Sequence, residues 1–157
     1  MRFNIINIFG LIIMLIISIP NIIYAFSGKQ IKDNYKNKVL NVLEQTGRYG
    51  TMVLMIFNIG LPEFGFWAKN GFVIWIVFIP ALILLYLIVW VLYFKIPKKA
   101  STLFILLAII PGVIFILHGI LLRHVLLCIF GAVFSAAHIV ITCKNCAAER
   151  CNDRGVF

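Results

Sequence analysis

The chain alternates between long apolar runs and short polar segments. Residues 4–26 and 72–94 carry no charged side chain, and a third run, 101–142, contains a single charged residue, Arg123. A helix needs about 20 apolar residues to cross the hydrocarbon core of a bilayer. The first two runs therefore each predict one membrane-spanning helix. Trp75, Trp90 and Tyr93 lie toward the two ends of 72–94, as aromatic residues at membrane interfaces do.

The third run is too long for a single crossing. Its apolar pattern breaks between His118 and His124, where Gly119 and Arg123 also lie. We predict two helices here, 101–121 and 125–142, joined by a tight turn. His118, Arg123 and His124 all fall near this turn and could form a small outward-facing polar cluster.

A weaker run, 49–67, has the length of a span but contains Asn58, Gly60, Pro62 and Glu63. An ionised carboxylate at mid-membrane costs roughly 2.5–3.5 kcal/mol or more. Near the end of the span, beside Trp67, the cost is smaller. Hydropathy alone therefore leaves four or five crossings open.

The distribution of Lys and Arg decides between them. With five crossings, eleven positive residues fall on one side of the membrane and three on the other; without 49–67 the division is seven and seven. Cytoplasmic loops carry the excess of Lys and Arg. We therefore predict a multi-pass protein of the cell membrane with five spans, its N-terminus outside and its C-terminus cytoplasmic. Residues 4–26 could also be a cleaved signal peptide, but cleavage would invert this charge bias.

Composition supports the lipid environment and excludes other classes. Apolar residues make up 63% of the chain and charged residues 12%, against about 45–50% and 25% in ordinary soluble domains. The net charge of +9 lies between the apolar runs, where it faces lipid headgroups, so we expect no nucleic-acid partner. The Ile-, Phe-, Asn- and Lys-rich composition resembles that of small bacterial membrane proteins.

Residues 27–47 form the long connection between the first two spans. Ile31, Tyr35, Val39 and Val42 recur at helical spacing, with Ser27 and Gly47 at the expected ends. This pattern predicts an amphipathic helix on the cytoplasmic membrane surface. A solvated loop and a docking segment for a partner protein are the alternatives.

Polar residues inside the spans are the candidate functional positions. We single out those that could line an intramembrane path or pack helices together: Asn58, Glu63, His118, His124, Ser135 and His138. A path for a proton, ion or small solute is one interpretation. The other, which we favour, is that these groups hold neighbouring helices together.

The predicted cytoplasmic tail, 143–157, contains Cys143, Cys146 and Cys151. Two cysteines separated by two residues can bind zinc or form a redox pair. A tetrahedral zinc site needs four ligands and the tail supplies three. We therefore expect no cofactor, with zinc on these cysteines as the alternative.

Together these patterns predict an all-α, polytopic bundle: one membrane domain of about five spanning helices and one interfacial amphipathic helix. No combination of residues indicates catalysis. We expect a non-catalytic accessory, immunity-type or interaction subunit, in contact with the lipid bilayer and with a second copy or a partner membrane protein. The alternative is an oligomeric transporter or channel subunit that uses the polar residues of the spans.

Overall fold

A computed structural model describes residues 6–27, 35–59, 65–66, 70–96 and 101–153. Its helices are α1 (Ile8–Phe26), α2 (Lys38–Ile56), α3 (Gly71–Lys95), α4 (Ser101–Leu121) and α5 (Val125–Asp153). Four of them, α1, α3, α4 and the part Val125–Glu149 of α5, are long and apolar enough to cross a membrane. This finding confirms the predicted class of helical, membrane-embedded protein.

The strongly apolar helices lie close to their predicted positions. The predicted spans 4–26, 72–94 and 101–121 correspond to α1, α3 and α4. Helix α1 begins at Ile8 because the Asn7 side chain caps it, accepting a hydrogen bond from the Gly10 amide at 3.1 Å. The predicted tight turn between α4 and α5 is present, with Arg123 in the left-handed conformation at φ 59°.

Helix α5 is longer than predicted. It continues past Thr142 to Asp153 and includes the cysteine segment that we expected to follow the last helix as a tail. Residues 143–153 contain no glycine or proline to end the helix. Contacts with other elements also hold it, since the Asn145 side chain accepts a hydrogen bond from the Tyr35 amide at 2.8 Å.

The segment between α1 and α3 differs most from prediction. A surface helix ending at Gly47 and a separate span beginning at Tyr49 were expected, but one helix, α2, runs from Lys38 to Ile56. Ser27 ends α1 instead of starting a new helix, and the Asn37 side chain caps α2. Gly47 lies inside α2, where a Cβ atom would be 2.7 Å from the backbone nitrogen of Phe134 in α5. This glycine therefore permits close packing rather than ending the helix.

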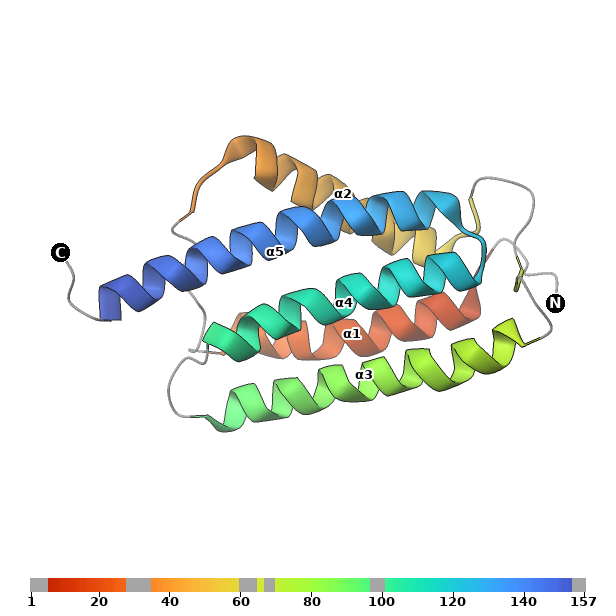
Figure 1. The fold of residues 1–157 in the computed structure, drawn as a ribbon, viewed down its shortest axis with the longest axis horizontal. Helices are drawn as coiled ribbons and strands as arrows, with labels where there is room; N and C mark the ends of the chain where they lie inside the picture. The colour runs from red at the N-terminus through yellow and green to blue at the C-terminus, as the bar shows by residue number, and fades with distance from the viewer. Residues whose placement is uncertain (1–5, 28–34, 60–64, 67–69, 97–100, 154–157) are drawn as a thin grey trace.

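The five helices pack as a closed ring. The principal contacts join α1 to α2, α2 to α5, α5 to α4, α4 to α3, and α3 to α1. Helices α1, α3 and α5 run in one direction, and α2 and α4 run in the other (Figure 1). We call the end that holds the α4–α5 turn the turn end. The opposite end, where α5 extends beyond its neighbours, is called the tail end.

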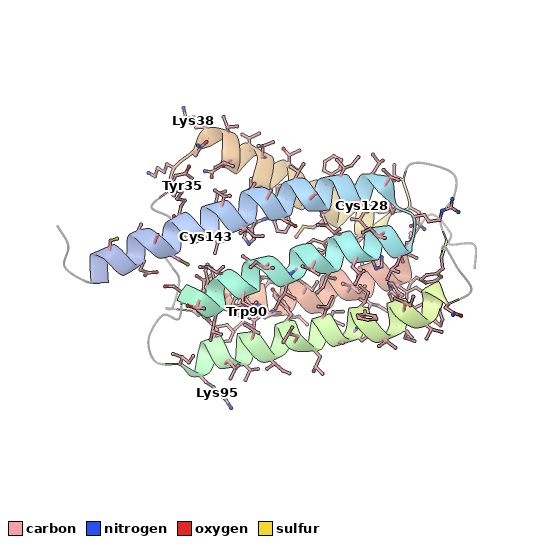
Figure 2. The ribbon with its side chains drawn as sticks, in the orientation of Figure 1. Tyr35, Lys38, Trp90, Lys95, Cys128 and Cys143 are labelled. Carbon is pink, nitrogen blue, oxygen red and sulfur yellow. The ribbon has the colours of Figure 1, made fainter. Side chains whose placement is uncertain are left out.

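Helix α2 spans the ring from one end to the other. Near the tail end, Tyr35 precedes α2 and bonds to Asn145 of α5. At the turn end, the Ile56 carbonyl accepts a hydrogen bond from the Asn7 amide at 2.7 Å, and Phe57 pairs with Ile6 in an isolated β-bridge. Lys38 of α2 and Lys95 of α3 both lie at the tail end, with side chains directed away from the bundle (Figure 2).

Candidate functional site

The ring of helices forms a partly open cavity of about 510 Å³. Its volume falls within the range of about 300–1,000 Å³ that is usual for small-molecule sites. All five helices contribute to its lining, which is mainly apolar and aromatic. The lining residues are Met14, Ile17, Ser18, Asn21, Ile22, Tyr24, Ala25, Arg48, Met52, Tyr86, Trp90, Phe104, Leu107, Ala108, Pro111, Phe115, Phe134 and His138.

A charged group lies beside this cavity, on α2 and α5. Glu44 is 5% exposed and forms an ion pair with Arg48, one helical turn further along α2. The same carboxylate oxygen lies 3.2 Å from Nδ1 of His138 on α5. Burying a carboxylate is costly unless it is paired and hydrogen-bonded, and Arg48 and His138 supply that pairing. We call these three residues the charged triad.

A smaller cavity of about 280 Å³ lies next to the larger one. Arg48 and His138 line both cavities, as do Tyr24 and Phe104. The remaining lining of the smaller cavity is mostly polar: Asn41, Glu44, Gln45, Ile141, Thr142 and Asn145. The triad therefore stands between a polar space and an apolar one.

Aromatic rings form much of the larger cavity near α3. The ring centroid of Tyr24 lies 5.4 Å from that of Trp90 and 5.3 Å from that of Phe104. The hydroxyl of Tyr86 accepts a hydrogen bond from the Asn21 side chain at 2.9 Å. Trp90 lies on α3, on the side that faces the other helices (Figure 2). These contacts connect α1, α3 and α4 along one side of the cavity.

His118 belongs to a different polar group, near the turn end. Its side chain is fully buried, and its Nδ1 accepts a hydrogen bond from Nε1 of Trp75 at 3.0 Å. Its Nε2 lies 3.3 Å from the side-chain nitrogen of Asn7. His124 is also buried. The expected outward-facing cluster of His118, Arg123 and His124 was therefore wrong, because both imidazoles pack into the bundle.

The other predicted path residues that the structure describes lie in different surroundings. His124 directly precedes α5 and caps it, accepting a hydrogen bond from the Leu127 amide at 3.2 Å; burial lowers its pKa, and backbone hydrogen bonds only partly oppose this. Ser135 bonds to the Gly131 carbonyl at 2.6 Å and packs where Gly112 of α4 leaves room. Asn58 follows the end of α2, half-buried. Glu63 lies outside the described residues.

The three cysteines all lie on α5 and differ in exposure. Cys146 is buried, with its Sγ 3.8 Å from the Ser101 carbonyl of α4, whereas Cys151 is exposed and Cys143 is intermediate. Within the described residues, no group of three or more His, Cys, Asp or Glu side chains could hold a metal ion. The described part of the chain therefore contains no preformed group of ligands that would support the zinc alternative.

Sequence reasoning missed two members of the triad. Glu44 lies in the segment expected to form a surface helix and was not among the candidate positions, and Arg48 entered only as one of the positive residues counted for orientation. The spacing of four residues between them was a signal for an ion pair on a helix. Nothing local connected this pair to His138, which is 94 residues from Glu44.

Comparison of the chain with protein-family models, with curated protein sequences and with solved structures found no match in any of the three. Function therefore has to be inferred from the cavity and the groups around it. The cavity can enclose a small molecule, and the triad can bind a polar group at one end of it.

Proposed function

We propose that the chain crosses the membrane five times, with α2 as the additional crossing. Helices α1 and α3 are neighbours in the ring and run in the same direction (Figure 1). If both cross the bilayer, the chain between them must return to the turn end. Helix α2 makes this return, at 38–56 rather than at the predicted 49–67.

The polarity of α2 supports a lipid environment around it. Its buried positions include Glu44, Gly47 and Thr51, whereas its exposed positions include Val39, Val42, Leu43, Tyr49 and Val53. A helix at a water-covered surface would turn its apolar side inward. In lipid, polar groups gain by facing the bundle interior instead, as Glu44 and Thr51 do in α2.

The orientation follows from the positive charges near the two ends of the proposed crossings. Arg48, one of the eleven positive residues counted above, lies in the middle of α2, which leaves ten positive residues on the tail side of the crossings and three on the turn side. We infer that the tail end faces the cytoplasm and that the N-terminus lies outside. A bacterial cell membrane remains our proposed location.

Within this topology, we propose that the protein is a non-catalytic accessory or immunity-type subunit that binds a small amphipathic molecule between its helices. The observation that carries the proposal is the partly open cavity formed by the helices of one chain, apolar along most of its lining and polar at the triad. Such a combination of apolar lining and a few convergent polar groups is typical of ligand sites. No second copy is needed to complete it.

The proposal predicts that filling the cavity displaces a bound molecule. Ala108 of α4 lines the cavity, so Ala108→Phe places a ring inside it. We expect native mass spectrometry of the wild-type chain, released from mild detergent, to show a monomer with a bound small molecule. Ala108→Phe should lose that additional mass.

The matched control is Val113→Phe, on the exposed side of the same helix, which should retain the bound molecule. If wild type and Ala108→Phe carry the same occupancy, or if neither carries any molecule in preparations where the chain is folded, the proposed function is wrong.

A transporter or channel subunit remains the second candidate. One observation favours it: Arg48 and His138 line both the polar and the apolar cavity, so a solute could pass from one to the other. This candidate requires passage to the turn end, where His118 is held between Asn7 and Trp75. A stable homo-oligomer in mild detergent would favour it over the single-chain binding protein.

A further inference from the structure

We infer that the larger cavity binds a single-chain anionic amphiphile of the fatty-acid class, with its carboxylate at Arg48 and its hydrocarbon chain between α1 and α4. This inference rests on the proposed function, since it names the chemical class of the molecule that the cavity holds. It depends on three features of the site, namely the charge at its polar end, its length and its volume.

The charge of the cavity favours an anionic head group. Among the described residues that line the larger cavity, Arg48 is the one Lys or Arg side chain, and none is acidic. Glu44 lines only the smaller cavity. A cationic ligand would therefore meet the Arg48 guanidinium before it reached the carboxylate, whereas an anion would meet a complementary charge.

Arg48 can bind a second carboxylate without releasing Glu44. Its side chain is 39% exposed, and the ion pair with Glu44 is made through Nη2. A guanidinium carries several N–H donors in a planar arrangement that suits carboxylates.

The polar group and the apolar lining are arranged end to end. Because Arg48 reaches Glu44, one turn earlier in α2, its guanidinium lies toward the tail end of the bundle. On α4, lining residues extend from Phe104 to Phe115 toward the turn end, about 16 Å along the helix axis. On α1 they extend over the same number of residues, from Met14 to Ala25. A chain whose head group lies at Arg48 would point toward Met14 and Phe115.

The volume of the cavity suits a ligand with one hydrocarbon chain better than a ligand with two. If a methylene needs about as much space as a water molecule, on the order of 30 Å³, then 510 Å³ has room for roughly 17 such groups. This is enough for one long acyl chain and too little for a two-chain phospholipid. Met14, Ile17 and Leu107 supply flexible and branched apolar contacts for the chain.

The test uses the purified full chain in a neutral detergent and a palmitate analogue with a photoactivatable diazirine in its hydrocarbon chain. We expect saturable labelling that maps to peptides of α1 and α4. Unlabelled palmitate should compete at least tenfold better than hexadecanol, which has a neutral head, or hexadecyltrimethylammonium, which has a cationic one. Dipalmitoyl phosphatidic acid, with two chains, should compete poorly.

Arg48→Gln should weaken palmitate binding about tenfold or more, the effect expected from losing a charged hydrogen bond. Lys95→Gln, which removes an exposed positive charge at the same end of the bundle (Figure 2), should have no effect. Since Arg48→Gln leaves Glu44 without its ion pair, the double variant Glu44→Gln/Arg48→Gln removes both charges together. It should still bind hexadecanol but lose its preference for palmitate.

The outcomes separate the ligand class from the proposed function. Equal competition by palmitate, hexadecanol and the cationic amphiphile, or strong competition by the two-chain lipid, would overturn the ligand class and leave a binding cavity. An unchanged palmitate preference in the double variant would overturn the role of Arg48. If the folded protein shows no saturable labelling by the palmitate probe, the fatty-acid inference fails, and the native mass spectrometry of wild type and Ala108→Phe then decides the proposed function separately.

Discussion

At the residue scale, His118 shows how a polar side chain is accommodated inside the bundle, where other buried side chains lie within hydrogen-bond distance of it. This imidazole is fully buried and connects three elements, because Trp75 is in α3 and Asn7 caps α1. The sequence offered two interpretations of His118, an intramembrane path or a contact that holds helices together. It did not indicate which residues His118 would contact. Trp75 was recognised only as an interfacial residue, since nothing in its spacing relates it to His118.

Replacing His118 with Leu should therefore destabilise the protein. The substitution leaves Trp75 Nε1 and the Asn7 amide without this partner, and unsatisfied buried groups cost about 1–3 kcal/mol. Because polar contacts in membranes are worth somewhat less on average, we expect a loss of about 1–2 kcal/mol. Unfolding followed by circular dichroism during a titration with a denaturing detergent measures it.

Ile120→Ala, at an exposed position of the same helix, is the control and should change the midpoint little. His118→Gln, which keeps a hydrogen-bonding side chain, should lose less than His118→Leu. Equal stability of wild type and His118→Leu would show that these contacts contribute nothing.

At the scale of the helix, α3 and α4 were predicted to within one residue at each end, and α1 ends where predicted but begins at Ile8 rather than at residue 4. Helix α2 was not predicted in this way. Long uncharged runs have few alternatives to a membrane span, so composition alone defines them. Helix α2 joins a polar half to an apolar half, and its polar residues were assigned to a water-facing side. In the structure Glu44 faces α5 instead, which no property of the isolated segment could indicate.

Gly47 is the residue that allows α2 and α5 to pack closely. A Cβ atom there would lie within 3 Å of the backbone nitrogen, the Cα and the Cβ of Phe134. We predict that Gly47→Ala separates the two helices and destabilises the protein by about 1–3 kcal/mol, as overpacking does. The same detergent titration measures this loss.

Thr46→Ala, at the neighbouring exposed position, provides a matched control in the same turn of α2. It should leave the midpoint unchanged. A Gly47→Ala variant as stable as Thr46→Ala would mean that α2 does not pack against α5 in this way, and it would also weaken the assignment of Glu44 to the triad.

At the scale of the whole molecule, the site exists because the ring of helices closes. Arg48, His138, Trp90 and Phe104 come from four different helices, and only the packing order brings them around one cavity. The sequence supplied His138 as a candidate but offered no pattern that pairs helices in space. The class of protein could therefore be predicted from the sequence, and the binding site could not.

The central claim is that α2 crosses the membrane with its polar face turned to the bundle. Cysteine labelling tests it in a background in which all four cysteines, Cys128, Cys143, Cys146 and Cys151, are replaced by Ser. Lys38→Cys places a thiol at the start of α2, and Ile59→Cys places one just beyond its end; both positions are exposed.

With a membrane-impermeant thiol reagent, we predict that Ile59→Cys is labelled in intact cells and that Lys38→Cys is labelled only after the cells are opened. The reverse pattern would keep the crossing but invert the orientation. Labelling of both cysteines under the same condition would place the two ends of α2 on one side of the membrane and contradict the account.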